Sequence, residues 1–229
     1  MDLSKILDLI FPHICVNCRR SVERGEVLCA RCFATIELNR TLFCGRCQAR
    51  LPDGQRICHF SFPYLLGAAG NYHNEALRRL IYTLKFEYLE LSAAPLGGFA
   101  VSYLERLHLP LEDFVVIPVP LARERLRERG FNQAERIAEV VSSRLRLPFY
   151  NAILERRKNT APQTTMADHE ARLKNVAGCF TVADPNLIRR KNVILIDDVT
   201  TSGATFLEAT QTMKQSGARR VVALAVAKG

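Results

Sequence analysis

The chain reads Val193-Ile194-Leu195-Ile196-Asp197-Asp198-Val199-Thr200-Thr201-Ser202-Gly203-Ala204-Thr205, and this stretch decides its fold. Four apolar residues run into two acids, and a small, hydroxyl-rich turn follows before a helical pattern begins. The apolar run is too short for a membrane span and is typical of a buried parallel strand. We therefore expect a strand, a tight turn and a helix in direct succession.

This turn predicts an anion site. The first backbone N–H groups of a helix have no partner within it, and the helix dipole adds partial positive charge, which suits a phosphate. Asp197 and Asp198 beside it are able to accept hydrogen bonds from vicinal hydroxyls or to hold Mg²⁺. The alternative is an ordinary acidic strand end, which is disfavoured because two buried carboxylates are costly. Walker A is excluded, since no lysine follows Gly203.

The segment resembles the 5-phosphoribosyl-1-pyrophosphate (PRPP) motif of type I phosphoribosyltransferases. The resemblance implies that Asp197 and Asp198 are catalytic and that Mg²⁺ accompanies PRPP. The PRPP-binding residues that it implies are Asp197, Asp198, Thr200, Thr201, Ser202, Gly203, Ala204 and Thr205.

Length and composition bound the rest of the chain. Its 229 residues with 48% hydrophobic content suffice for one substantial core plus a small appendage. No stretch approaches the ~18 continuous apolar residues of a transmembrane helix. Residues 1–11 are too acidic and interrupted for a signal peptide, and predict a short amphipathic helix with Ile6, Leu7 and Ile10 on one face. We expect a cytoplasmic protein without membrane insertion.

Seven of the eight cysteines fall between residues 15 and 58. In a cytoplasmic chain this predicts metal binding rather than disulfides. Two Cys-x2-Cys knuckles supply four soft ligands for a tetrahedral structural zinc, against the alternative of buried free thiols. The predicted ligands are Cys15, Cys18, Cys29 and Cys32.

The cysteine spacing then repeats. Cys44, Cys47 and Cys58 lie 29 residues after the first three ligands, and Gly54 and Ile57 match Gly25 and Leu28 in the same way. The fourth position of this second ribbon is Ser61, and a neutral hydroxyl is a poor zinc ligand. Two readings stay open: His59 completes a second zinc site, or the ribbon has lost its metal. The isolated Cys179 is expected to be a small buried residue.

A helical pattern with Asn74 as its N-cap follows the ribbons and contains Leu84-Lys85-Phe86. The sequence Pro95-Leu96-Gly97-Gly98 predicts a break or bend before a second helical stretch. The β-branched run from Phe114 to Pro120 predicts the first core strand, with its prolines at the exit end.

An arginine-rich loop is expected next, before an amphipathic helix from Ala134 to Leu145. Such a loop after the first core strand suits the pyrophosphate of PRPP. The alternative is a solvated charge run in which Glu124 and Glu128 pair locally. The predicted pyrophosphate-binding residues are Arg123, Arg125, Arg127 and Arg129.

The remaining pattern alternates strands and helices. We expect strands at 149–154, 180–182, 192–196 and 221–225, a mobile donor-rich loop at 156–165, and a last helix that stops at Gly217. Together they predict an α/β fold, a doubly wound parallel sheet with its site at the strand carboxyl ends. The predicted domains are a zinc-ribbon unit at 1–63 and a phosphoribosyltransferase-like unit at 64–229.

Several motifs in order make the chain similar to the ComF family of phosphoribosyltransferase-like proteins, which includes GntX-type members. They are the paired cysteine knuckles, Leu84-Lys85-Phe86, Arg129-Gly130-Phe131-Asn132-Gln133, Thr160-x2-Gln163, Arg172-x2-Asn175 and the PRPP motif. Ser61 is the one departure. The resemblance implies a type I phosphoribosyltransferase fold with an unsettled acceptor, and a role in handling incoming single-stranded DNA during natural competence.

Three function classes follow: an enzyme that transfers phosphoribose, a PRPP sensor, or a single-strand DNA-binding factor with a vestigial site. The formal net charge of +9 and pI of about 9.4 suit both DNA and pyrophosphate. Phe43, Phe60 and Phe62 are candidates for base stacking. Further expected partners are DNA-uptake or recombination proteins.

Overall fold

The computed structural model describes residues 12–52, 58–158 and 174–229. Their largest sheet has six strands in the order β2-β1-β3-β8-β7-β4. These strands are β1 (Leu42–Cys44), β2 (Arg50–Leu51), β3 (Leu65–Asn71), β4 (Phe114–Pro118), β7 (Asn192–Thr200) and β8 (Arg220–Lys228). The four strands from β3 to β4 run parallel, while β1 is antiparallel to both neighbours. The predicted α/β fold with a largely parallel sheet is confirmed.

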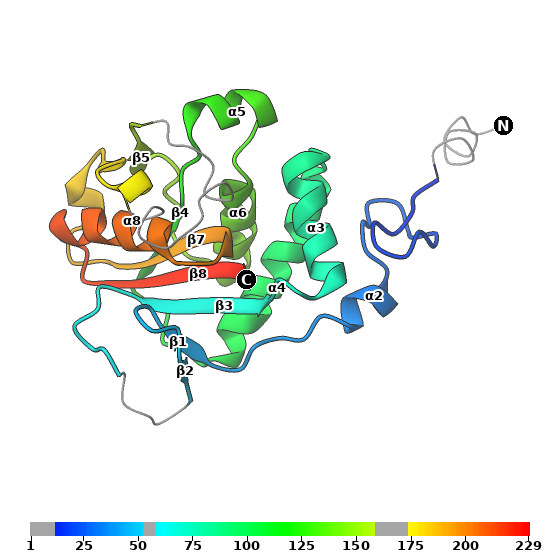
Figure 1. The fold of residues 1–229 in the computed structure, drawn as a ribbon, viewed down its shortest axis with the longest axis horizontal. Helices are drawn as coiled ribbons and strands as arrows, with labels where there is room; N and C mark the ends of the chain where they lie inside the picture. The colour runs from blue at the N-terminus through cyan, green and yellow to red at the C-terminus, as the bar shows by residue number, and fades with distance from the viewer. Residues whose placement is uncertain (1–11, 53–57, 159–173) are drawn as a thin grey trace.

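Helices cover both faces of this sheet (Figure 1). The helices are α2 (Ala30–Ala34), α3 (Glu75–Phe86), α4 (Ala93–Arg106), α5 (Arg123–Arg129), α6 (Gln133–Leu145) and α8 (Ala204–Gln215). Two single 3₁₀ turns lie at Glu90–Ser92 and Pro185–Leu187. A separate antiparallel pair joins β5 (Leu154–Arg156) to β6 (Phe180–Val182). No helix in these described segments combines the length and apolarity that a membrane span requires.

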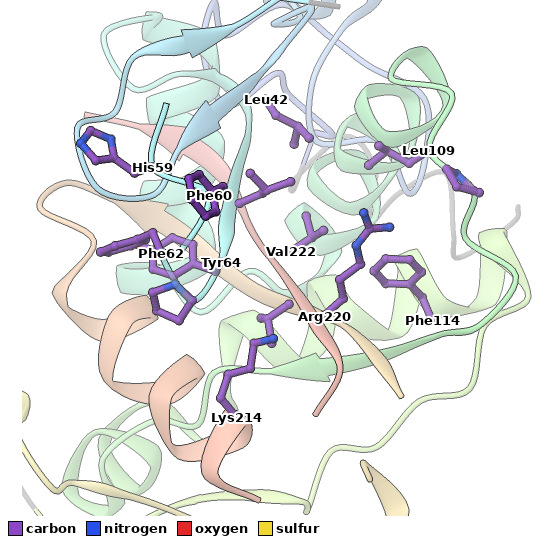
Figure 2. A pocket seen from close by; sticks show the side chains of 14 residues that line it. Leu42, His59, Phe60, Phe62, Tyr64, Leu109, Phe114, Lys214, Arg220 and Val222 are labelled. Carbon is purple, nitrogen blue, oxygen red and sulfur yellow. The ribbon is translucent and has the colours of Figure 1, made fainter. Parts of the chain in front are cut away.

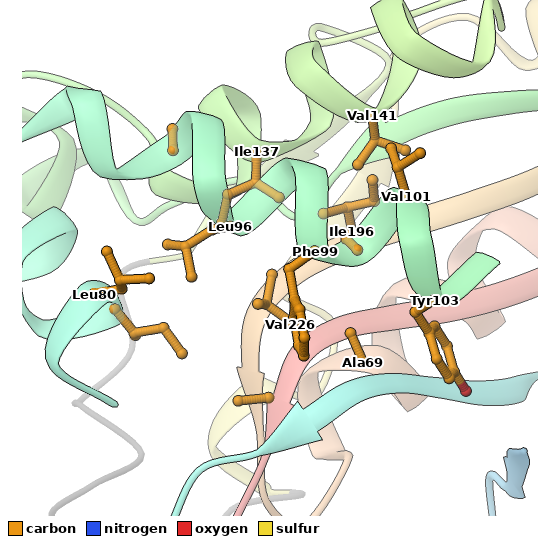
Figure 3. Close-up of a cluster of buried hydrophobic side chains, with 14 of the residues drawn as sticks. Ala69, Leu80, Leu96, Phe99, Val101, Tyr103, Ile137, Val141, Ile196 and Val226 are labelled. Atoms are coloured by element: carbon orange, nitrogen blue, oxygen red, sulfur yellow. The ribbon is translucent and has the colours of Figure 1, made fainter. Parts of the chain in front are cut away.

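The middle parts of the central strands are apolar because each of their faces packs on a different hydrophobic cluster. Ile194 and Ile196 of β7 belong to the cluster with α3, α4 and α6. Figure 3 shows Phe99 of α4 and Ile137 of α6 in this cluster, together with Ile196. Val193 and Leu195 belong to the other cluster, with Phe206 and Met213 of α8. Because successive side chains of β7 point to opposite faces of the sheet, this one strand contributes to both hydrophobic clusters.

Local signals at the helix starts and stops were reliable. The Asn74 side chain accepts a hydrogen bond from the Leu77 N–H at 3.0 Å, which confirms the predicted N-cap. Helix α8 ends at Gln215, and Gly217 follows with φ of +95°, as predicted. Strand β6 and the two long central strands are confirmed, although β7 and β8 extend beyond the predicted bounds.

The break predicted at Pro95-Leu96-Gly97-Gly98 is wrong, because these residues lie inside α4. Pro95 is in the first helical turn, where a missing N–H costs nothing. Gly97 has a packing role, since a Cβ there would lie 2.5 Å from the Val140 Cβ on α6. The glycine therefore permits close helix contact rather than ending the helix.

The first core strand was also predicted wrongly. Strand β3 precedes β4 and pairs in parallel with β8. Its glycines and alanines are not typical of a strand sequence. Small residues stand there because the helices pack closely: a Cβ on Gly70 would lie 2.7 Å from a methyl carbon of Leu77. The strand predicted at 149–154 lies later, at β5, and Phe149 makes a single bridge to Val116.

Other predictions fall outside the described residues. They concern the helix at 1–11 and the repeat positions Gly54 and Ile57. Most of the loop at 156–165, with Thr160 and Gln163, and the motif residue Arg172 also lie outside. The domain boundary at residue 63 stays a prediction. On its N-terminal side, β1 and β2 pair into the central sheet.

Candidate functional site

The acid pair lies at the carboxyl end of β7, between β4 and β8. Because side chains alternate along a strand, Asp198 faces the α3 side of the sheet and Asp197 the opposite side. The Asp198 N–H donates a hydrogen bond of 2.8 Å to Asp197 Oδ1. Asp198 is buried, and Asp197 keeps some exposed surface around a carboxylate that is itself enclosed. The pair is therefore held in place before any ligand binds.

Lys85 is a site residue whose role the sequence did not indicate. It lies in the last turn of α3, and its Nζ is 2.8 Å from Asp198 Oδ1. The available signal was the Leu84-Lys85-Phe86 motif, which places a lysine next to the buried Leu84. This cation balances the buried carboxylate and lies where a polyanionic ligand would meet the strand ends.

The two carboxylates share one electrostatic environment. Burial and then the charge of Asp198 raise the pKa of Asp197 to about 7, while Lys85 opposes this shift. Asp197 therefore binds a proton much more tightly than an exposed aspartate does. Such a perturbed group at a strand end is typical of a functional site.

The predicted strand, turn and helix occupy the expected positions around residues 201–203. Gly203 has φ of +76° and is the N-cap of α8, which is why the position suits glycine. Gly203 has no side chain with which to cap this helix, and the Ala204 N–H donates a long hydrogen bond of 3.4 Å to Ser202 Oγ. The dipole of α8 adds partial positive charge at this start, which suits an anion.

The arginine-rich segment is a helix rather than the predicted loop. Arginine, glutamate and leucine are good helix formers, and the segment spans α5 until Gly130 ends it with φ of +78°. The helix divides the four predicted arginines between two faces. Arg125 and Arg129 are partly buried against the molecule, whereas Arg123 and Arg127 are exposed.

Helix α5 is linked to the acid pair through Phe86, the neighbour of Lys85. The Arg129 guanidinium lies 5.3 Å from the centre of the Phe86 ring. Burial lowers the pKa of Arg125, and the charges of Arg156 and Arg129 lower it further. Arg125 therefore lies near Arg129 and Arg156, and Glu128 partly offsets their charge.

The motif from Arg129 to Gln133 explains how α5 is joined to α6. Asn132 accepts a hydrogen bond from the Ala134 N–H at 3.1 Å and donates one to the Val119 carbonyl at 3.0 Å. Gln133 accepts a hydrogen bond from Arg129 at 3.0 Å. These contacts tie the arginine helix to the exit of β4.

The first set of cysteines fits one zinc ion. Its four ligand atoms all lie within 4.8 Å of one another, and Cys18 Sγ lies 3.7 Å from Cys29 Sγ. Bonds of about 2.3 Å in a tetrahedron would place the sulfurs roughly 3.8 Å apart. Burial acts to raise the pKa of Cys15, but backbone hydrogen bonds from Cys18, Cys29 and Asn17 lower it to about 6. Cys15 is therefore favoured as a thiolate, the form that binds metal.

The second set gathers in the same way. The ligand atoms of Cys44, Cys47, Cys58 and His59 also lie within 4.8 Å of one another. His59 Nδ1 is 3.4 Å from Cys44 Sγ, and Cys47 Sγ is 3.5 Å from Cys58 Sγ. This geometry favours the interpretation in which His59 takes the place that Ser61 leaves open. Cys179, in contrast, is fully buried, as predicted.

Family models match both parts of the chain. A double zinc ribbon domain matches residues 6–60, and a phosphoribosyl transferase domain matches residues 131–229. The first match and the two ligand clusters together support structural zinc. The second begins at Phe131, just after the arginine helix, and covers the acid pair and the phosphate turn.

Curated relatives extend over most of the chain. The chain is 27% identical to Competence protein F of Haemophilus influenzae over an alignment of 224 residues. The match covers 92% of this chain and 95% of that protein. The chain is 29% identical to DNA utilization protein YhgH of Escherichia coli K12, covering 91% and 87%. It is 26% identical to Competence protein ComFC of Streptococcus pneumoniae, covering 91% and 84%. The chain is therefore a homologue of the competence protein F, ComFC and YhgH proteins, and it joins a double zinc ribbon to a phosphoribosyl transferase domain.

Proposed function

We propose that the chain binds PRPP and transfers its phosphoribosyl group, with release of pyrophosphate, to an acceptor that remains to be identified. The observation that carries this proposal is the meeting of three features at one sheet edge. They are the acid pair with its raised Asp197 pKa, the glycine turn at the start of α8, and the cations Lys85, Arg125 and Arg129.

Each feature suits one part of the ligand. The backbone N–H groups at the start of α8 suit the 5-phosphate, aided by hydroxyls of the 200–205 segment. Asp197 and Asp198 suit the ribose hydroxyls and stabilise the positive charge that develops on the ribose as the C1–O bond breaks. Lys85, Arg125 and Arg129 suit the pyrophosphate that leaves with the electron pair of that bond. The acceptor lone pair forms the new bond to C1, and the acceptor loses its proton.

Magnesium fits the same donors. The carboxylates of Asp197 and Asp198 are the hard oxygen ligands that Mg²⁺ takes together with substrate phosphates. When bound, it would supply charge neutralisation for the leaving pyrophosphate. Asp197 is available as a carboxylate above its pKa of about 7, so this role strengthens in mildly alkaline solution.

Thermal unfolding and pyrophosphate release test this proposal. Millimolar PRPP with Mg²⁺ should raise the unfolding temperature, because a ligand at a hundredfold its Kd stabilises the native state by about 2.7 kcal/mol. Absence of any shift would reject the site. Pyrophosphate should then be released with one member of a panel of bases and single-stranded DNA. Binding without release would favour a sensor. In an active enzyme, Asp197→Ala should lower kcat more than PRPP affinity.

A second function, single-strand DNA binding, is favoured by a hollow of about 280 Å³ away from the acid pair. Figure 2 shows His59, Phe60 and Phe62 on one side of it and Lys214 and Arg220 on another. Phe60 is 88% exposed, so its ring is available to a base, while the two cations suit phosphates. Two relatives are named competence proteins and a third a DNA utilization protein.

The predicted stacking residues differ in exposure. Phe43 is buried in the sheet, with Lys228 Nζ 5.7 Å from its ring centre, so the prediction that it stacks on DNA is wrong. Phe62 packs on Tyr64 with ring centres 5.2 Å apart. Phe60 is therefore the best-placed aromatic. We propose in addition that the protein acts in the cytoplasm together with DNA-uptake or recombination proteins.

Fluorescence anisotropy with a labelled oligothymidylate tests the DNA function. The logarithm of affinity should fall with the logarithm of salt concentration, with a slope of about −0.7 per contacted phosphate. Phe60→Ala should weaken binding roughly tenfold, as loss of one stacked base does. Phe33→Ala, which alters an exposed phenylalanine of the first ribbon, is the matched control. Equal losses in both variants, or binding insensitive to salt, would contradict the assignment.

A further inference from the structure

The carbonyl groups of the phosphate turn are held from outside the turn. The Thr200 carbonyl accepts a hydrogen bond from the Gly229 N–H at 2.9 Å. The Thr201 carbonyl accepts one of 2.9 Å from the side-chain amide of Gln48. The Gly203 carbonyl lies 3.4 Å from the Tyr64 hydroxyl. Two of these three contacts come from the region of the second zinc ribbon.

These contacts determine which way the peptides of the turn face. In a trans peptide the C=O and the following N–H point in opposite directions. Holding the Thr201 carbonyl toward Gln48 therefore turns the Ser202 N–H to the other side of that peptide. The Gly203 carbonyl accepts the Leu207 N–H of α8 at 2.9 Å and lies 3.4 Å from the Tyr64 hydroxyl, so helix and tyrosine together turn the Ala204 N–H to the other side of that peptide. A phosphate requires this arrangement, because it is attracted to N–H dipoles and repelled by carbonyl oxygens.

Gln48 is itself positioned by the metal knuckle. It directly follows Cys47, and its N–H donates to the Cys44 carbonyl at 2.9 Å. Its φ of +58° is unusual for a residue with a side chain, so the knuckle must maintain this conformation. Metal binding at Cys44 and Cys47 therefore helps to determine where the Gln48 amide points.

Tyr64 is the second link between the ribbon and the turn. Its buried hydroxyl lies 3.3 Å from the Gly45 carbonyl of the knuckle and 3.4 Å from the Gly203 carbonyl. Packing is tight at both ends. A Cβ on Gly45 would lie 2.6 Å from the Tyr64 carbonyl oxygen, and one on Gly203 would lie 2.7 Å from the Tyr64 hydroxyl oxygen. The Tyr64 hydroxyl therefore lies between a carbonyl of the knuckle and a carbonyl of the turn.

We infer that the second zinc ribbon is part of the PRPP site, with Gln48 and Tyr64 as positioning residues that orient the phosphate turn. Metal at Cys44, Cys47, Cys58 and His59 then sets the affinity of the turn for phosphate, although no metal ligand touches the substrate. This inference rests on the proposed PRPP function for its ligand, whereas the coupling itself is a property of the ligand-free protein.

The duplication provides a matched control for the test. The test protein carries Gln48→Ala and Tyr64→Phe. The control carries Arg19→Ala and Tyr103→Phe. Arg19 occupies the equivalent place in the first ribbon, with φ of +64° and an N–H that donates to the Cys15 carbonyl at 2.9 Å. Tyr103 is also buried, and its hydroxyl donates to the Thr41 carbonyl at 2.7 Å and accepts the Ala68 N–H at 3.3 Å, away from the turn. Both proteins should retain their zinc.

Hydrogen exchange of peptides covering residues 200–206 is measured first, on ligand-free, zinc-loaded protein. We expect roughly tenfold faster exchange in the test protein only, which corresponds to loss of about one net hydrogen bond. Titration calorimetry with PRPP and Mg²⁺ should then show roughly tenfold weaker binding in the same protein. Tyr64→Phe alone, with Gln48 intact, should give an intermediate result.

Unchanged exchange at residues 200–206 in the test protein would overturn the inference, and so would an equal change in the control. If the wild-type protein binds no PRPP, the proposed function fails, and the exchange result by itself decides whether the ribbon orients the turn. Faster exchange with unchanged PRPP affinity would also overturn it, since orientation of the turn would then not govern binding.

Discussion

The two zinc ribbons have the same local geometry but different neighbours. In each, the residue after the knuckle donates its N–H to the first cysteine carbonyl at 2.9 Å, at Arg19 and again at Gln48. The first ribbon packs on α3, where Arg79 Nε donates to the Val16 carbonyl at 3.2 Å. The second is continuous with the sheet, because β1 pairs with β3 and Gln48 reaches the phosphate turn.

This difference shows that two ribbons can share the same local structure and still have different roles. A knuckle is determined by a few neighbouring residues, so both copies form it. What each knuckle contacts depends on the chain around it, and the second copy lies beside the start of β3 and reaches the phosphate turn through Gln48. We therefore expect damage to the first ribbon to remain local, and damage to the second to reach the candidate active site.

The largest expected effect comes from removing one ligand of each ribbon. Cys15→Ser and Cys44→Ser both replace a buried thiol, and each should lower zinc stoichiometry from two to one. Structural zinc contributes on the order of 10 kcal/mol in peptides, so each ribbon should unfold locally. Only Cys44→Ser should abolish PRPP binding. Metal analysis and calorimetry check this, and equal loss of binding in both variants would remove the distinction.

Two glycines with similar backbones give the next effect. Gly25 in the first ribbon has φ of +91° with nothing within 4 Å of an added Cβ, whereas Gly203 has φ of +76° and faces the Tyr64 hydroxyl oxygen at 2.7 Å. Gly25→Ala should cost about 1–2 kcal/mol from the backbone alone. Gly203→Ala should cost about 1 kcal/mol more from overpacking and weaken PRPP binding. Urea unfolding and PRPP titration measure both, and identical behaviour would refute the crowding argument.

Helix α3 contacts the first ribbon and the acid pair at different points, which allows a third comparison. Lys85→Met leaves Asp198 buried without its counter-charge and should cost about 2 kcal/mol of stability. Glu87→Gln removes the charge from an exposed pair with Arg79 at 2.6 Å and should cost at most about 1 kcal/mol.

Adding Asp198→Asn to Lys85→Met should restore much of the lost stability, because no buried charge then remains. The full double-mutant cycle in urea measures this coupling. Additive effects of Lys85→Met and Asp198→Asn would show that the 2.8 Å ion pair contributes nothing.

The smallest effect is a pH dependence at Asp197. Its folded pKa of about 7 lies above the usual value of 3.8, so the folded state binds the proton more tightly than the unfolded chain. The associated stability is fully present below about pH 4 and is lost as pH rises through 7. Between pH 6 and 8, wild type should lose stability relative to Asp197→Asn. Parallel urea curves across this range, with zinc content verified, would contradict the shifted pKa.

Features built from neighbouring residues were predicted well. The cysteine knuckles, the Asn74 cap, the stop at Gly217 and the strand-turn-helix around Asp197 are all in place. Each depends on backbone geometry within a few residues, which composition and spacing describe directly. The arginine segment shows the limit, because a loop was expected from its charge although its residues favour a helix.

The errors share a different cause. Strand β3 was missed because its glycines and alanines are small for the sake of α3 and α4, which pack on it. Gly97 reads as a breaker but serves the contact with Val140 of α6. In both places a small residue is needed because a segment far away in the sequence packs closely against it.

The sequence by itself determined the parts of this protein: two zinc knuckles, a phosphate turn after an acid pair, and a basic segment. Their relations came from tertiary structure alone, because each joins residues far apart in the chain. Lys85 meets Asp198, Arg129 covers Phe86, and Gln48 holds the Thr201 carbonyl. The physical reason is that local patterns set backbone conformation, whereas ion pairs and hydrogen bonds between elements depend on how the whole sheet and its helices pack.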